Sequence, residues 1–173
     1  MATNLQFIKE ETLGSQAASM SITDCFSSAY DVYQVIITKM TASADDNMRF
    51  TYIDNGGSEI TASNYEYAQL IMYSSTSFGS DKNTGQTSTP LGGYGLQGTD
   101  EGMGMVMTVF NPFNSTYTFS TVQIGYKAGT THTEVGRKGI GVYKGTDSMT
   151  GIKFKMNASA EYEQLTAKVY GVK

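Results

Sequence analysis

Side chains that commonly do catalytic chemistry are scarce in this chain. It has one histidine, His132, and one cysteine, Cys25, beside 12 tyrosines, 8 phenylalanines and 10 methionines. One cysteine excludes an intramolecular disulfide and any single-chain zinc site that needs two cysteines. Cys25 is therefore expected to be a small buried apolar residue, as free cysteines usually are. His132 has no G-x-S-x-G nucleophile motif to partner it, so a hydrolase triad is not expected.

One segment matches a cofactor-binding pattern by its letters alone. Residues 93–98 read GYGLQG, which fits the G-x-G-x-x-G pattern of dinucleotide-binding proteins. That pattern needs a strand before it and a helix after it, because the helix N-terminus holds the pyrophosphate. Here Pro90 and Gly92 precede the segment, and a methionine-rich strand pattern follows it. The segment is interpreted as a loop, and no cofactor is predicted.

Acidic side chains occur in pairs, but each pair lies in an expected turn, loop or strand edge. The pairs are Asp45/Asp46, Asp100/Glu101 and Glu161/Glu163. Such carboxylates are usually solvated, and charges at strand edges discourage association between sheets. The run from Asp54 to Glu59 offers oxygen ligands for calcium, but it departs from EF-hand spacing and no helices flank it. These patterns predict no catalytic residue and no metal site, so the chain is not expected to be an enzyme.

Charge and hydropathy argue against two classes of partner. The net charge is −4 and there is no basic block, so electrostatic binding of nucleic acid is not expected. No run approaches the length of about 18 apolar residues that spans a membrane. Residues 1–4 lack the features of a signal peptide, so synthesis in a cytoplasm is expected. Only 16% of residues are charged, which favours either an adhesive surface or a subunit that buries much of its surface against neighbours.

Period-2 patterns run through the whole chain and predict the elements that hold these side chains. We expect strands at 5–12, 19–23, 32–41, 48–53, 65–76, 103–110, 116–126, 131–143, 151–156 and 165–172. Residues 32–41 are the most apolar run and are expected to be buried on both faces, forming a hairpin with 48–53. The sequence predicts an all-β chain, a single antiparallel β-sandwich over residues 1–173, jelly-roll-like, with about nine or ten strands.

A glycine-rich segment, 79–102, interrupts the strand pattern and is expected to be a long loop. Loops of this length inside a compact domain are uncommon, and they are usually functional or disordered. Its sizeable apolar residues are Leu91, Tyr94 and Leu96. These three are the candidate binding residues. Three interpretations stay open: contact with a neighbouring subunit, a recognition surface, or disorder.

Four segments of the sequence resemble a known family. Residues 25–37 read CFSSAYDVYQVII, which resembles the F-S-x-x-Y-D-x-Y-x-V-x-I signature of small β-sandwich virion structural proteins of tailed bacteriophages, including marine ones. Residues 48–52, MRFTY, occupy the place of the L-R-F-x-Y strand that follows the signature in that family. Residues 151–154 and 167–173, GIKF and AKVYGVK, are similar to the last two strands of those proteins. The usual glycine before the closing strand is absent here.

The resemblance implies a non-enzymatic bacteriophage virion protein, most specifically a capsid decoration protein that stabilises the head. Its partners would be the major capsid protein or other virion proteins, and a homo-oligomer, with a trimer as the first guess, is expected in the virion. The first alternative is a tail or head fibre domain, or a carbohydrate-binding module for receptor recognition. The second is an enzyme such as a small glycan hydrolase, acting through paired carboxylates.

Overall fold

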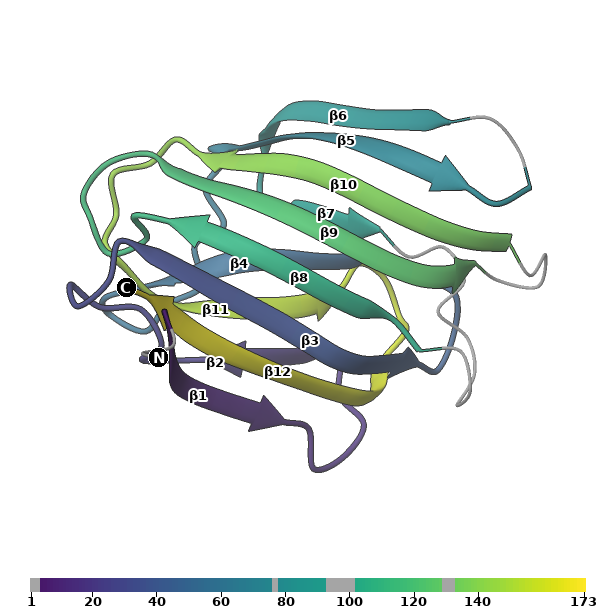
Figure 1. The fold of residues 1–173 in the computed structure, drawn as a ribbon, viewed down its shortest axis with the longest axis horizontal. Coiled ribbons are helices and arrows are strands. Elements are labelled where there is room, and N and C mark those ends of the chain that lie inside the picture. Colours follow the sequence, from purple (N-terminus) through teal and green to yellow (C-terminus); the bar gives the residue numbers. More distant parts are fainter. Residues whose placement is uncertain (1–3, 76–77, 93–101, 129–132) are drawn as a thin grey trace.

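The computed structural model describes residues 4–75, 78–92, 102–128 and 133–173, and these residues form twelve strands and no helix (Figure 1). In chain order the strands are β1 (Leu5–Thr12), β2 (Ser19–Ile22), β3 (Val32–Ala42), β4 (Met48–Asp54), β5 (Tyr65–Tyr73), β6 (Gly79–Gln86), β7 (Thr89–Gly92), β8 (Gly104–Phe110), β9 (Thr118–Ala128), β10 (Thr133–Tyr143), β11 (Met149–Met156) and β12 (Tyr162–Val172). Ten of them overlap the expected ranges, and the two extra strands are β6 and β7. The described residues contain no helix of the length and apolar character needed to cross a membrane.

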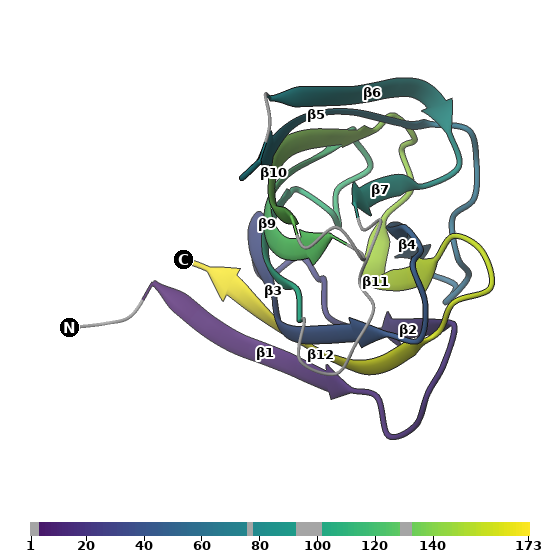
Figure 2. The same ribbon diagram turned by 90° about the vertical axis from the view of Figure 1, so that its right-hand side faces the viewer.

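The strands form two packed antiparallel sheets. The large sheet has eight strands in the order β1-β12-β3-β8-β9-β10-β5-β6, and the small sheet has four in the order β2-β11-β4-β7. From the side, the large sheet curves around the small one (Figure 2). We call the face of the large sheet that packs on the small sheet its inner face, and the opposite one its outer face. The predicted all-β antiparallel sandwich is confirmed, with sheets of unequal width.

Alternation of side chains decides which residues enter the core. In β3, Tyr33, Val35 and Ile37 are buried on the inner face, whereas Gln34 and Ile36 between them are partly exposed on the outer face. The expectation that 32–41 is buried on both faces is therefore wrong. The outer face of β3 has no second layer over it in the described residues. A half-covered strand of an antiparallel sheet shows this pattern.

The expected hairpin between 32–41 and 48–53 is also wrong, because β3 and β4 belong to different sheets. β3 pairs with β12 and β8, whereas β4 pairs with β11 and β7. The connection crosses from one sheet to the other and is fixed by Asp46. Its carboxylate accepts the backbone N–H of Asn47 at 2.7 Å and that of Ala158 at 2.7 Å. A polar turn between two apolar runs fits a crossover between sheets as well as it fits a hairpin.

The glycine-rich segment does not form one long loop. Residues 79–86 form β6, the edge strand beside β5, and residues 89–92 form β7, the edge of the small sheet. The strand pattern is weak because β6 carries polar and glycine residues, and its register on β5 shifts between Tyr65 and Tyr67, close to Gly85 at φ 62°. Residues 93–101 lie outside the described residues.

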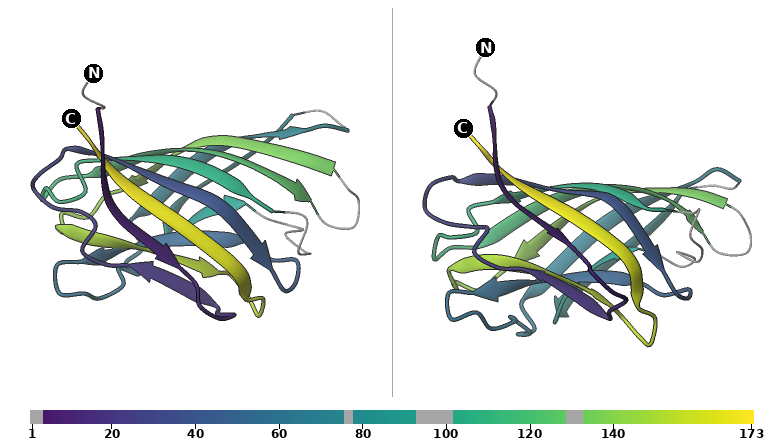
Figure 3. Two further views of the ribbon diagram at one scale, coloured as in Figure 1. Left: turned by 60° about the horizontal axis from the view of Figure 1, so that its bottom comes forward. Right: turned by 90° about the horizontal axis from the view of Figure 1, so that it is seen from below.

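Two of the segments that carry the family resemblance, 25–37 and 167–173, lie side by side in the fold. β12 pairs with β3, with Val172 opposite Val32 (Figure 3). The ring of Tyr30 lies against Gly171, where a Cβ atom would be 2.6 Å from the ring. Phe26 and Tyr33 are buried in the core, with ring centroids 4.9 Å apart. The similar sequence motifs therefore form one packing unit at the end of the sandwich where the two chain termini lie.

Candidate interaction surface

Cys25, a residue with potential chemistry, has a structural role. It is buried, and its Sγ donates a weak hydrogen bond to the carbonyl oxygen of Ile22 at 3.4 Å. Burial raises the pKa of the Cys25 thiol to about 12, and a thiol that stays protonated is a poor nucleophile. The prediction of a buried, apolar cysteine is confirmed. His132 lies outside the described residues.

Two of the candidate carboxylates, those of Asp46 and Asp54, are engaged by the backbone. Asp46 is buried and joins two loops, as described above. Asp54 accepts the backbone N–H groups of Gly56 at 2.8 Å and Ser58 at 2.9 Å, so its carboxylate closes its own turn. Asp100 and Glu101 lie outside the described residues. In the part of the chain that the structure describes, no group of three or more histidine, cysteine, aspartate or glutamate side chains is placed to hold a metal ion.

Glu59 connects two strands of the small sheet through its carboxylate. It accepts hydrogen bonds from Lys153 at 2.8 Å, from Thr51 at 3.0 Å and from Lys155. Burial opposes ionisation of Glu59, but these donors outweigh it and lower the pKa of the carboxyl group to about 2. The arrangement ties β4 to β11, because Thr51 lies on β4 and both lysines lie on β11.

Replacing Glu59 with glutamine is expected to lower the free energy of unfolding by about 1–2 kcal/mol at pH 7, after allowance for solvent screening. The folded-state pKa of about 2 lies below the ordinary value of 4.5, so the stabilisation is present above pH 4.5 and is lost as the pH falls toward 2. Urea unfolding of wild type and Glu59→Gln from pH 7 to pH 2.5 measures the difference. Glu163→Gln, at an exposed site on β12, is the control. A difference that stays constant over this range would contradict the assigned role.

The three candidate binding residues are not brought together on a described surface. Leu91 is fully buried on β7, where it is part of the core. Tyr94 and Leu96 lie outside the described residues. Leu91 was expected in a loop, and its burial follows from the pairing of β7 with β4 at the edge of the small sheet. A role for Leu91 in surface binding is therefore wrong.

The described surface carries a row of apolar side chains in direct cross-strand register on the outer face of the large sheet. Val172 is opposite Val32, Val32 is opposite Phe110, Phe110 is opposite Phe119, and Phe119 is opposite Val142. We call these five residues, on β12, β3, β8, β9 and β10, the apolar row. Four members are partly exposed, and Phe119 retains 50% of its accessible surface. Cross-strand neighbours lie about 5 Å apart, so the row is continuous.

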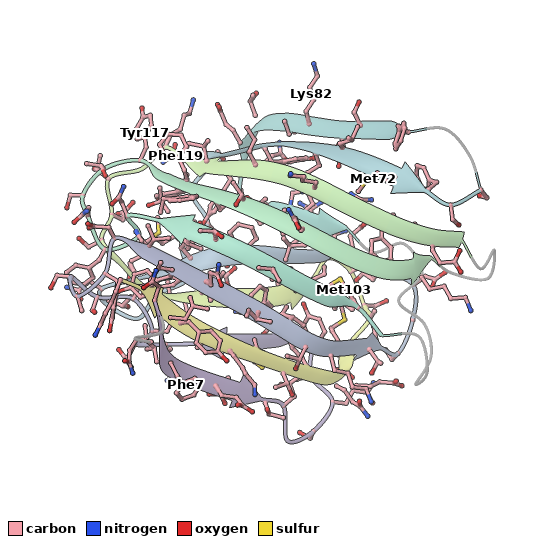
Figure 4. The ribbon with its side chains drawn as sticks, in the orientation of Figure 1. Phe7, Met72, Lys82, Met103, Tyr117 and Phe119 are labelled. Carbon is pink, nitrogen blue, oxygen red and sulfur yellow. The ribbon has the colours of Figure 1, made fainter. Side chains whose placement is uncertain are left out.

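Further exposed apolar side chains flank this row. Tyr117 lies beside Phe119 where β9 begins, and Ile140 lies two residues from Val142 along β10 (Figure 4). Phe7 on β1 lies in the neighbouring cross-strand row, where its ring packs edge-on against Tyr170 with centroids 5.7 Å apart. A soluble monomer rarely keeps a large contiguous apolar area in water, and such areas commonly mark interaction sites. The outer face is the candidate interaction surface of this chain.

A shallow hollow lies at the opposite end of the same face. Gly104, Gly125 and Gly136 are opposite one another on β8, β9 and β10, so the backbone is uncovered there. The hollow over these strands has a volume of about 580 Å³, and its lining includes Val106, Gln123 and Lys138. The Met72 side chain lies over Gly136, where a Cβ atom would be 2.9 Å from the Met72 methyl carbon. Glycines within strands permit close approach of another group to the backbone.

Sequence patterns alone did not locate the apolar row. Alternation places every second residue on one face, but the strands carry apolar residues on both faces, so the inner and outer sets look alike. In β9, Val122 and Ile124 are buried while Phe119 is exposed. The informative signal is cross-strand register, and register depends on which strands are neighbours. That order was not available from the sequence, because strands distant in sequence, such as β3 and β12, pair with each other.

Comparison with known proteins places the chain in no family. No family model matches the sequence, and no curated protein matches it. Among solved structures, the chain is similar to a fructofuranosidase variant from Schwanniomyces occidentalis in complex with fructosylnystose, at 6% sequence identity and a TM-score of 0.27. That alignment covers 99% of this chain and 35% of the fructofuranosidase chain. A likeness at this level carries no conclusion about activity.

Proposed function

We propose that this protein is a non-enzymatic structural protein of a bacteriophage particle, and most specifically a decoration protein on the surface of the capsid. The observation that carries the proposal is the apolar row, which crosses five strands on the outer face of the large sheet. The bacteriophage setting comes from the sequence motifs at 25–37 and 167–173, which resemble those of small β-sandwich virion proteins. The partner surface belongs to the major capsid protein or to another virion protein.

The proposed mechanism is mechanical. A decoration subunit binds across the joint between neighbouring capsid subunits and buries apolar surface that separation of the joint would expose again. Each apolar Å² removed from water contributes about 25 cal/mol, and a standard interface buries about 800 Å² on each partner. Burial on this scale favours the closed joint. The same burial accounts for exposed aromatic side chains such as Phe119 and Tyr117 in a chain of low charge.

Replacing Phe119 with lysine is expected to weaken binding to expanded phage heads about tenfold or more, because burying a phenylalanine side chain contributes about 1.5–3 kcal/mol. Cosedimentation of purified protein with heads that lack it measures the affinity. Asn83→Lys is the matched control, because it adds the same charge at an exposed position on β6, away from the apolar row. Heads that bind the wild type are also expected to gain resistance to heat.

Three outcomes would contradict the proposal. The wild type fails to bind heads, Phe119→Lys and Asn83→Lys bind equally well, or particles lacking the protein resist heat and chelators as well as complete particles do. Binding on a glycan array without binding to heads would instead favour a receptor-recognition module. Release of sugar from a glycan substrate would favour an enzyme.

A further inference from the structure

The outer face of the large sheet is depressed along β5, between β10 and the edge strand β6. Ala68 on β5 is opposite Ile140 on one side and Lys82 on the other. Because the alanine side chain is short and its two cross-strand neighbours are long, the surface sinks between them. Leu70, the next outer-face residue along β5, is 49% exposed, and Ile140 is 56% exposed. We call this depression, lined by these four residues, the β5 groove.

Two adjoining hollows make up the β5 groove. Their volumes are about 500 Å³ and 430 Å³, and both are lined by Ala68, Lys82 and Ile140. The groove is shallow and open to solvent, whereas a small molecule usually loses about 70–90% of its surface to its binding site. A side chain presented by a partner protein fits an open site better, because the body of the partner covers it from above.

Two lysines flank the groove without a carboxylate partner. Lys138 lies opposite Leu70 on the β10 side, and Lys82 lies on the β6 side, where it extends from the edge of the sheet (Figure 4). Among the described residues, neither lysine lies within ion-pair distance of an aspartate or glutamate. Both side chains are exposed, and their flexible four-carbon stems allow them to reach over the groove.

Two acidic residues contribute to the lining of the groove, and both are engaged. Glu66 forms an ion pair with Lys144 at 2.6 Å. Asp81 alternates with Lys82 along β6, so its carboxylate points to the opposite face of the sheet. There it accepts a hydrogen bond from the Tyr67 hydroxyl at 3.3 Å. In the part of the chain that the structure describes, the groove therefore presents two cations and no free carboxylate, although the net charge of the chain is −4.

The apolar floor and the two lysines together define the chemistry of the occupant. Exposed apolar side chains favour an apolar group over them, and unpaired cations favour an anion beside it. Two lysines are too few for stable attraction to an anionic membrane, for which clusters of about four to eight are typical. They are also few beside the roughly six to ten phosphate contacts of proteins that bind nucleic acid. A protein segment that carries both an apolar side chain and carboxylates fits best.

We propose that the β5 groove binds a short acidic segment of a partner protein, with one leucine, isoleucine or phenylalanine among its carboxylates. The apolar side chain lies over Ala68, and the carboxylates face Lys82 and Lys138. Strands lie about 4.8 Å apart, so β6 and β10 are separated by about 10 Å and the two lysines approach the segment from opposite sides. The inference does not rest on the proposed function, because the groove selects this chemistry on any partner.

Titration with synthetic peptides tests the proposal. The probes are three hexapeptides with blocked ends, with leucine, isoleucine or phenylalanine at the third position and glutamate at every other position. Two-dimensional NMR of the 18.7 kDa chain gives both the affinity and the location, from the shifts of backbone amides. The shifts are expected to concentrate at 66–70, 80–84 and 138–142. Matched peptides with glutamine in place of glutamate are expected to bind about tenfold more weakly or less.

Variants of the protein separate the two contributions. Lys82→Gln combined with Lys138→Gln is expected to weaken binding of the acidic peptides about tenfold at low ionic strength. Lys39→Gln combined with Lys173→Gln is the matched control, because it removes the same charge at exposed positions outside the groove. Ala68→Phe fills the floor and is also expected to weaken binding about tenfold. All these positions are exposed, and circular dichroism of each variant verifies that it is folded.

Four outcomes would overturn the proposal. No acidic peptide binds at about 1 mM, glutamate and glutamine peptides bind equally well, the groove variants bind as tightly as the control, or the shifts map to another surface. Binding to vesicles that contain phosphatidylglycerol, without binding to the peptides, would assign the lysines to a membrane and overturn the protein partner. The head-binding assay of Phe119→Lys is separate from these measurements, so either proposal can fail without the other.

Discussion

Replacing Tyr33 with alanine is expected to lower the free energy of unfolding by about 3–5 kcal/mol, the range for large-to-small changes at buried aromatic residues. Tyr33 has no exposed surface. Its ring lies edge-on against Phe26, with centroids 4.9 Å apart, and against Tyr30, with centroids 5.8 Å apart. Its removal leaves a cavity where β3 begins. Urea unfolding at pH 7, followed by circular dichroism, measures the loss.

A milder variant separates the ring from its hydroxyl. The Tyr33 hydroxyl accepts the backbone N–H of Ser27 at 2.8 Å and donates to the carbonyl oxygen of Ser27 at 2.8 Å. Tyr33→Phe keeps the ring and removes both hydrogen bonds, so it is expected to cost about 1–2 kcal/mol. Equal losses in the two variants would show that packing of the ring contributes nothing. An alanine variant as stable as the wild type would contradict the assigned place of Tyr33 in the core.

Much of the fold could be predicted from sequence because alternation is a local property. In 48–53 the alternate residues Met48, Phe50 and Tyr52 are all buried in β4, as the pattern predicts, although Thr51 and Ile53 are buried as well. Burial of Cys25 also followed from its residue type. Strand pairing is a property of the whole chain, and local patterns do not contain it. The turn at 43–47 therefore looked like a hairpin, although Asp46 ties it to Ala158 across the sandwich.

The candidate surface was less accessible to sequence reasoning than the core. A polar, glycine-containing strand such as β6 has no hydrophobic face, because it lies at an edge with little to bury. The sequence pattern of this segment therefore predicts a loop that includes Leu91, although the segment forms two strands. Phe119 is the converse case: it is exposed, but its residue type alone would place it in the core. Both cases depend on the position of a strand within its sheet, which sequence periodicity does not report.

The position of each strand within the large sheet also explains why the motifs at 25–37 and 167–173 belong together. The signature segment supplies Tyr30 and Tyr33, and the closing strand supplies Gly171, which is paired with Tyr33 in the ladder between β3 and β12. The ring of Tyr30 covers Gly171 and packs on Tyr33. A tyrosine at position 30 therefore requires a residue without a side chain at position 171. This steric requirement gives both motifs a physical cause, independent of any shared function.

Gly171→Ala is accordingly expected to lower the free energy of unfolding by about 2–3 kcal/mol, the upper part of the range for overpacking a core. The new Cβ atom would lie 2.6 Å from Cγ and Cδ2 of Tyr30. The backbone at Gly171 is held on both sides, by β1 and by β3, so the ring must move and lose its contact with Tyr33. Gly125→Ala on β9 is the matched control, because nothing lies within 4 Å of its Cβ position. That change is expected to be neutral or to stabilise by less than about 1 kcal/mol.

A double-mutant cycle decides whether Tyr30 is the cause. Tyr30→Ala removes the ring and costs stability by itself, but it opens the space that a methyl group at position 171 needs. Adding Gly171→Ala to Tyr30→Ala is therefore expected to cost less than about 1 kcal/mol, against 2–3 in the wild-type background. An equal cost in both backgrounds would show that the glycine is required for the backbone of β12 rather than for the tyrosine. In that case the two motifs would be neighbours in the sheet without being coupled.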